Sequence, residues 1–162
     1  METPIAFPEE IANVYDTIMH YFDYKTSARL IDDIIKRNKP NSKPSLLELG
    51  IGTGSLAIEL QQLGYSIEGI DQSQAMLTRA IKKGLSLQSL HEGDVTNFSL
   101  GKEFGVLISH AGPLRIDYTP KRGYFFEMYA TSSPSYDDVR AAVQKISEHL
   151  EEEGLFLMSV QS

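Results

Sequence analysis

The stretch Leu46–Ser55, with the sequence LLELGIGTGS, decides the fold of this chain of 162 residues. A short apolar run contains Glu48 and leads into three glycines at alternate positions, Gly50, Gly52 and Gly54. Glycine adopts positive φ without strain and has no side chain to hold a ligand away from the backbone. Helical spacing of apolar residues resumes directly afterwards, at positions 56, 57, 60 and 63. A strand, a glycine loop and a helix N-terminus in this order are typical of a site for a nucleotide-type cofactor.

The spacing of the glycines bears on which cofactor the loop binds. Dinucleotide-binding loops have the pattern G-x-G-x-x-G, whereas this chain has G-x-G-x-G followed by Ser55. Glu48 stands two residues before the first glycine, where an anion disfavours a pyrophosphate and favours a cationic group. For this segment taken alone, the alternative is a tight connection that binds no ligand.

Two further acidic residues lie at the ends of predicted strands. Asp71 ends the segment Tyr65–Asp71 and comes 21 residues after Gly50. In dinucleotide-binding folds, an acid about 20 residues beyond the glycine loop accepts the ribose hydroxyls. Asp94 lies near the end of a third predicted strand, Leu87–Val95, although Gly-Asp is also common in turns.

Together these residues resemble the class I S-adenosylmethionine-dependent methyltransferases. The run ELGIGTG is similar to the first motif of that family, and GIDQSQAML at positions 69–77 is similar to a G-x-D-x-S-x-x-M-L segment that its members often have. The resemblance extends from about Leu46 to Val160. It implies S-adenosyl-L-methionine as cofactor and an α/β fold: a Rossmann-like, doubly wound, mostly parallel sheet with an N-terminal helical cap.

The resemblance also implies roles for individual residues. It places the glycine loop against the methionine and adenosine parts of the cofactor, and Asp71 on the ribose. It places Asp94 on the adenine amine and the backbone N–H of Val95 on a ring nitrogen. Met76 has two interpretations, an adenine contact or a core residue of its helix. The predicted cofactor-binding residues are Glu48, Gly50, Gly52, Gly54, Asp71, Gln72, Met76, Asp94, Val95, Ser109 and Tyr24.

Residues that follow the fourth predicted strand, Phe104–Ser109, are expected to face the reacting group, because ligands bind at the carboxyl ends of such strands. His110 is the leading acid–base candidate, since imidazole titrates near neutral pH; the alternative is that it only lines the pocket. The chain has no Asn/Asp-Pro-Pro-Tyr motif here and no acid cluster of the metal-dependent type. The resemblance therefore favours metal-free methylation of a nitrogen or oxygen of a small molecule.

Two aromatic segments are expected near the acceptor. The chain has helical spacing over residues 11–22 and 28–35 and resembles the family's N-terminal cap; Tyr15 is a candidate for acceptor contact, with a helix-core role as the alternative. Residues 113–134 are predicted to form an insertion containing a hairpin of strands 114–118 and 123–129. Tyr124 and Tyr129 are its candidate acceptor contacts. A self-packed segment or a dimer contact is the alternative for the insertion.

Composition limits the class of protein. The length predicts a single domain, residues 1–162, with a helical cap over 1–43 and the core over 44–162. A net charge of −7 argues against a nucleic-acid substrate, and the absence of cysteine excludes disulfides and thiolate–metal sites. The sequence has no apolar run long enough for a membrane span. We expect a cytoplasmic protein that binds a small-molecule acceptor and neither nucleic acid nor membrane.

The chain ends at Ser162, just after a fifth predicted strand, Gly154–Val160. Members of the resembled family usually continue with a helix and strands six and seven. We therefore expect either a homodimer or a completing C-terminal segment to cover the edge of the fifth strand. Two other classes of function stay open: a methyltransferase-fold module that binds cofactor or partner without catalysis and, less favoured, a NAD-dependent oxidoreductase.

Overall fold

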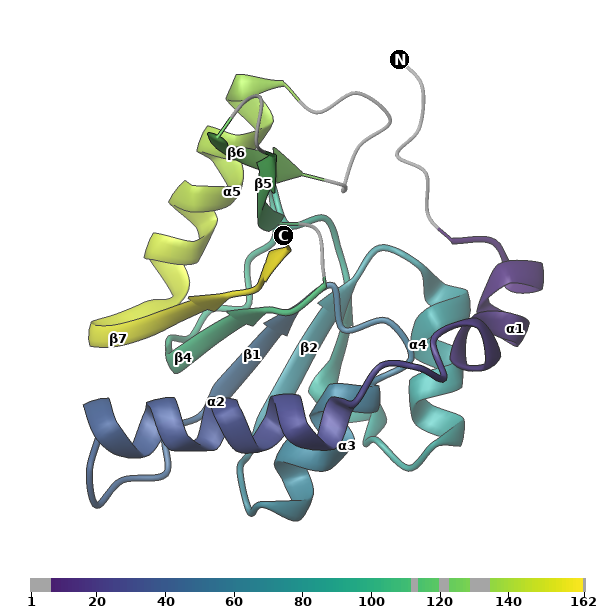
Figure 1. The fold of residues 1–162 in the computed structure, drawn as a ribbon, viewed down its shortest axis with the longest axis horizontal. Coiled ribbons are helices and arrows are strands. Elements are labelled where there is room, and N and C mark those ends of the chain that lie inside the picture. The colour runs from purple at the N-terminus through teal and green to yellow at the C-terminus, as the bar shows by residue number, and fades with distance from the viewer. Residues whose placement is uncertain (1–6, 112–113, 120–122, 129–134, 162) are drawn as a thin grey trace.

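A five-stranded parallel sheet forms the centre of the protein (Figure 1). The computed structural model describes residues 7–111, 114–119, 123–128 and 135–161. The sheet has the order β3-β2-β1-β4-β7, so the direction of winding reverses at β1, which lies between β2 and β4. The predicted Rossmann-like α/β fold is confirmed. Its strands are β1 (Leu46–Leu49), β2 (Ile67–Asp71), β3 (Leu90–Glu92), β4 (Phe104–Ser109) and β7 (Leu150–Met158).

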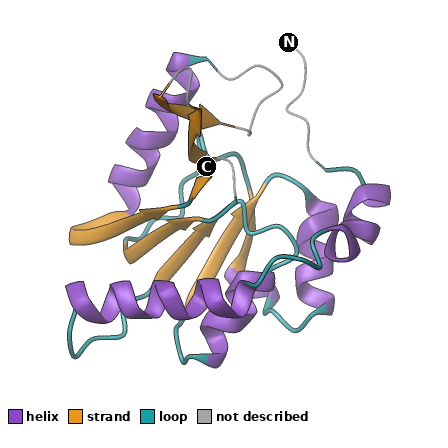
Figure 2. Cartoon of the chain, in the orientation of Figure 1, coloured by secondary structure: helices purple, strands orange, loops and turns teal. Residues whose placement is uncertain are grey.

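Helices cover both faces of this sheet (Figure 2). The helices α2 (Tyr24–Asn38), α3 (Ser55–Gln62) and α4 (Gln74–Lys82) lie on one face, and α5 (Tyr136–His149) lies on the other. Within β1, Leu46 packs into the core of the first face, whereas Leu47 and Leu49 pack into the core that includes α5. Because both faces are covered, β1 is buried along its whole length, Glu48 included.

The first helix, α1 (Glu9–Ile18), packs against α4 at one side of the molecule (Figure 1). It ends earlier than the helical spacing over residues 11–22 predicts. Phe22 and Asp23 instead form a short connection, in which the Asp23 side chain accepts a hydrogen bond from the backbone N–H of Thr26 at 3.0 Å and so caps α2. None of the helices in the described part of the chain is long and apolar enough to cross a membrane.

Two predicted strands differ from the observed ones. The third is shorter than Leu87–Val95, because the Ser86 side chain accepts from Gln88 N–H and begins a 3-10 helix, η1 (Leu87–Ser89). The fifth begins earlier, at Leu150, with a register shift against β4, and ends at Met158. Beyond it, Ser159 donates its backbone N–H to the Ser109 carbonyl at 3.0 Å.

A second, small sheet follows β4. The strands β5 (Leu114–Thr119) and β6 (Gly123–Met128) pair antiparallel, which confirms the hairpin predicted in the insertion. The strand β8 (Val160–Gln161), whose first residue was predicted to end the fifth strand, instead pairs parallel with β5. Tyr124 lies in β6 opposite Tyr118, whereas Tyr129 lies outside the described residues. The proposed roles of both tyrosines stay predictions.

Asp32 connects α2 to the loop that follows α3. It is buried, with 7% exposure, and accepts hydrogen bonds from the Tyr65 hydroxyl at 2.8 Å and from Lys36 Nζ at 2.6 Å. Burial alone would raise the pKa of this carboxyl, but the two hydrogen bonds, together with the charges of Lys36 and Lys43, outweigh it and lower the pKa below its ordinary value of 3.8. The ionised form of Asp32 therefore stabilises the folded chain.

Replacing Tyr65 by Phe should lower the free energy of unfolding by about 1.5–3 kcal/mol at neutral pH, since it removes a hydrogen bond to a charged group. The difference from wild type should persist down to the ordinary Asp pKa of 3.8 and shrink as the pH falls further through the lowered folded-state pKa. Urea unfolding across this pH range measures it. A difference that is the same in acid and at neutral pH would contradict the role given to Asp32.

Candidate functional site

The loop between β1 and α3 has an unusual backbone. Gly50, Gly52 and Gly54 have φ values of 69°, 56° and 73°, all in the left-handed region that favours glycine. A Cβ added to Gly54 would lie 2.3 Å from Leu85 Cδ1 and 3.2 Å from Ala80 Cβ, so this glycine allows the start of α3 to pack closely against α4 and the residues that follow it. A Cβ on Gly52 would meet no atom within 4 Å, so this glycine borders open space where a ligand can approach the backbone.

Asp71, at the carboxyl end of β2, fixes this loop. Its Oδ2 accepts the backbone N–H of Gly52 and its Oδ1 accepts that of Ser73, each at 2.8 Å. Burial raises the pKa of Asp71 above its ordinary value, although these two hydrogen bonds partly offset the effect. A carboxylate has about four acceptor sites, so Asp71 retains capacity for two more donors such as ribose hydroxyls.

Glu48 lies in β1, directly before the glycine loop. Its side chain is buried, with 3% exposure, and its Oε2 has no hydrogen-bond partner among the described residues. Burial, and then the neighbouring charge of Asp71, raise the pKa of Glu48 well above its ordinary value. A buried carboxyl without a partner is costly, and it is relieved by a proton, a donor or a cation. Glu48 therefore has the properties expected of a ligand-binding acid.

Tyr15 of α1 and Tyr24 of α2 converge on these acids. Burial is the main reason why the pKa of each phenol is raised. The charge of Asp71 adds to the shift of Tyr15, and Tyr15 and Glu48 add to that of Tyr24. Both tyrosines therefore lie near the acids that border the glycine loop, and their contacts with a cofactor or an acceptor stay predictions.

His110 directly follows β4 and belongs to an aromatic cluster beside the same site. Its ring lies 5.3 Å from Phe22 and 6.5 Å from Tyr24, measured between centroids. Its Nε2 is buried without a hydrogen-bond partner in the described chain, and burial lowers its pKa, so the ring is neutral at pH 7. Sequence reasoning missed Phe22, because an aromatic residue in a short connection matches no motif.

An apolar cavity of about 320 Å³ opens beside His110, between α2 and the ends of β4 and β7. Its apolar walls come from Leu30, Ile31 and Ile34 of α2 and from Leu157 of β7, with Ser109 and His110 at its edge. The cavity therefore lies on the same edge of the sheet as the glycine loop.

The other predicted residues have less distinctive surroundings. Asp94 accepts from both the backbone N–H and the hydroxyl of Thr96, each at 2.8 Å through Oδ1, so it closes a turn as Gly-Asp pairs often do. Met76, Val95 and Ser109 have exposures of 1%, 4% and 0%, and the burial of Met76 matches its interpretation as a core residue. Gln72 lies in the turn after Asp71. Contacts of these residues with a cofactor stay predictions.

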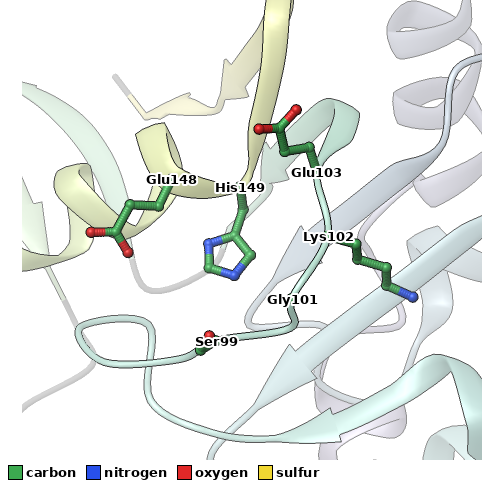
Figure 3. Close-up of a pocket in the computed structure, with 6 residues that line it drawn as sticks. All are labelled: Ser99, Gly101, Lys102, Glu103, Glu148 and His149. Carbon is green, nitrogen blue, oxygen red and sulfur yellow. The ribbon is translucent and has the colours of Figure 1, made fainter.

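A larger cavity, of about 470 Å³, lies at the opposite edge of the sheet, before β4 begins (Figure 3). His149 lines it and uses both ring nitrogens: Nδ1 donates to the Lys145 carbonyl at 2.8 Å, and Nε2 accepts from Leu100 N–H at 3.0 Å. Lys102 is paired with Glu68. These polar groups are already satisfied within the protein, so the cavity is a poor candidate for catalysis.

Comparison with known proteins agrees with the site at the glycine loop. Residues 46–135, more than half of the chain, match the methyltransferase domain family. The chain belongs to this family. The match begins at β1 and includes the glycine loop, Asp71, Asp94 and His110. The matched residues therefore contain most of the predicted cofactor site and His110, whereas Phe22 and Tyr24 precede them.

The chain is similar to several bacterial proteins. It is 29% identical over 151 residues to the dTDP-3-amino-3,4,6-trideoxy-alpha-D-glucopyranose N,N-dimethyltransferase of Streptomyces venezuelae, covering 91% of this chain and 55% of that protein. The crystal structure of Streptomyces venezuelae DesVI matches with a TM-score of 0.65 and 29% identity, over 90% of this chain and 56% of that one.

An S-adenosylmethionine-dependent methyltransferase from Clostridium acetobutylicum matches with a TM-score of 0.67 and 25% identity, over 91% of this chain and 55% of that one. The chain thus spans about half the length of these relatives.

Gly52 and Gly54 of the glycine loop give a matched pair of variants. Gly54→Ala should lower the free energy of unfolding by about 2–5 kcal/mol, because it adds overpacking against Leu85 to left-handed strain. Gly52→Ala meets no neighbouring atom and should cost only the strain, about 1–2 kcal/mol. Urea unfolding of both variants measures the difference. Equal losses would show that the packing role of Gly54 is wrong.

Proposed function

We propose that this chain forms the cofactor-binding part of an enzyme that transfers a methyl group from S-adenosyl-L-methionine to a nitrogen or oxygen of a small molecule. The observation that carries the proposal is Glu48, a buried carboxyl with an unpartnered oxygen beside a glycine loop. A cofactor with a cationic amino-acid end supplies the positive charge that this carboxyl lacks within the described chain. Membership of the methyltransferase domain family also supports this proposal.

The residues present fit such a cofactor. Gly52 gives a ligand room to lie against the backbone, and Asp71 retains acceptor sites for two hydroxyls. Glu48, which loses its charge easily when the site holds no cation, favours a positively charged ligand. When bound, the cofactor supplies a methyl group already activated on a sulfonium. The protein then has mainly to align the acceptor with that group and to exclude water.

His110 is the group best placed to handle a proton. Its lowered pKa keeps the imidazole neutral at pH 7, and the buried Nε2 has no partner among the described residues, so it is available to accept a proton from an acceptor. Phe22 packs against the ring with an interplanar angle of 75° and holds its orientation. The apolar cavity lined in part by His110 offers the acceptor a place beside this residue.

The relatives favour a nitrogen nucleophile. The Streptomyces venezuelae relative is by its name an N,N-dimethyltransferase of an amino sugar nucleotide. We therefore propose a small molecule that carries an amine as the acceptor class. The similar proteins give no support for a NAD-dependent oxidoreductase. The G-x-G-x-G spacing of the loop also disfavours one.

Calorimetry with S-adenosylhomocysteine and with NAD tests the cofactor. The wild-type chain should bind the first and not the second. Glu48→Gln should weaken binding of S-adenosylhomocysteine by about tenfold, roughly 1.4 kcal/mol. The same variant should leave the free energy of unfolding unchanged or higher, because it removes a buried acid that has an unpartnered oxygen.

The exposed Glu152→Gln is the matched control for this experiment and should change neither quantity. Binding of NAD in preference to S-adenosylhomocysteine would overturn the proposal. Transfer of a labelled methyl group to a panel of amines and alcohols then separates an enzyme from a module that only binds the cofactor.

His110→Gln tests the proton acceptor. Wild-type kcat should fall as the pH drops through the His110 pKa, which lies below the ordinary value of 6.5, because protonated imidazole cannot accept a proton. The variant should lose about 10²- to 10⁴-fold in kcat and also lose this acidic limb. Its affinity for S-adenosylhomocysteine should stay the same. An unchanged pH profile in the variant would exclude His110 as the base.

A further inference from the structure

The helix α1 has little apolar attachment to the rest of the protein. Of its ten residues, all within the described part of the chain, Ala12 alone is buried. Ile11, Val14 and Ile18 have exposures of 38%, 45% and 54%. Burial of apolar area therefore contributes little to holding α1, and its position depends more than usual on polar contacts.

Those contacts centre on Asp16, which lies opposite the glycine loop. Its Oδ1 accepts from the Thr53 hydroxyl at 2.5 Å and from the Ser55 hydroxyl at 3.4 Å. Lys83, at the end of α4, donates to the same Asp16 oxygen at 3.1 Å. Lys83 Nζ also lies 3.2 Å from Thr53 Oγ1 and 2.6 Å from Ser55 Oγ. One carboxylate and one ammonium thus join α1, the glycine loop and α4.

Two flanking hydrogen bonds reach the same elements. The Ser73 hydroxyl donates to the carbonyl of Phe7 at 2.6 Å, and Arg79 donates to the carbonyl of Asn13 at 3.3 Å. The backbone N–H of Ser73 also donates a hydrogen bond to Asp71 Oδ1. The N-terminal segment is therefore attached to both loops that border the cofactor site.

Thr53 links the contacts of Asp16 to the glycine loop of the cofactor site. Thr53 lies between Gly52 and Gly54, two residues with left-handed backbone, and is 2% exposed. Glycines leave a loop many alternative conformations. The bond from the Thr53 hydroxyl to Asp16 selects one of them, and the same bond holds α1, with its Tyr15, against the site.

We propose that Asp16 and Lys83 are positioning residues that couple closure of α1 to the binding conformation of the glycine loop. This rests on the proposed function, since the loop is taken to bind S-adenosyl-L-methionine. The pair is about one-third exposed, with side-chain exposures of 35% for Asp16 and 29% for Lys83. Ion pairs of this kind stabilise only weakly, so α1 is able to open without unfolding of the core.

A charge swap tests the coupling, because the Thr53 and Ser55 hydroxyls can donate or accept and so serve either arrangement. Asp16→Lys and Lys83→Asp should each weaken binding of S-adenosylhomocysteine about 5- to 10-fold. The double variant should recover affinity to within about 2-fold of wild type. Calorimetry measures affinity, and hydrogen exchange of the amides in residues 9–18 without ligand measures opening of α1.

The matched control is the pair Lys145–Glu148 on α5, joined at 2.7 Å and also partly exposed. Lys145→Asp, Glu148→Lys and their double variant should change neither affinity nor the exchange of α1. A merely structural role for Asp16 and Lys83 predicts lower stability of the whole domain instead. Urea unfolding should therefore show changes within about 0.5 kcal/mol for all these variants.

The outcomes separate this proposal from the proposed function. If the wild-type chain does not bind S-adenosylhomocysteine, the proposed function is wrong and the coupling falls with it. If wild type binds but the single variants bind equally well, only the coupling is overturned. Loss of affinity that the double variant does not restore would show that the two residues act separately, which also overturns it.

Discussion

The rest of the site depends on one hydrogen bond, from the backbone N–H of Gly52 to the Asp71 carboxylate at 2.8 Å. Three left-handed glycines cannot fix their own loop, so its conformation needs an anchor from another element. The parallel pairing of β1 with β2 supplies that anchor, because it places the ends of the two strands side by side. The other Asp71 oxygen holds Ser73, so one carboxylate orders both loops around the site.

Two acids at the site, Asp16 and Glu48, have pKa values that are shifted in opposite directions. Burial would raise the pKa of Asp16, but the hydrogen bonds from Thr53 and Lys83, together with the charges of Lys83 and Arg79, outweigh it and lower the pKa. Glu48 receives no such charge within the described chain, and its pKa is raised. Asp16 is therefore suited to holding elements of the protein together, whereas Glu48 is suited to a cationic ligand. This difference in surroundings is the reason why Asp16 and Glu48 have different proposed roles.

Much of the fold was predictable from local sequence. The bounds of β4 match the prediction because Phe104–Ser109 is apolar up to its last residue, and α5 begins at Tyr136. There, Ser135 and Asp138 form a reciprocal capping box. The third and fifth strands were wrong at their ends, because a serine-capped 3-10 turn and a register shift against β4 change the pairing without changing the apolar pattern. The cluster of Asp16, Thr53 and Lys83 was not predicted, since its members lie far apart in the sequence.

The sequence by itself determined the order of strands and helices, the glycine loop and the two acids, Glu48 and Asp71, that border it. Spacing carries that information, because strand, loop and helix are set by neighbours in the chain. The tertiary structure alone decided what covers the loop. Phe22 meets His110, and Asp16 meets Thr53, through contacts between residues 37 or more positions apart. Such contacts follow from how helices pack on the sheet, which no local pattern in the chain specifies.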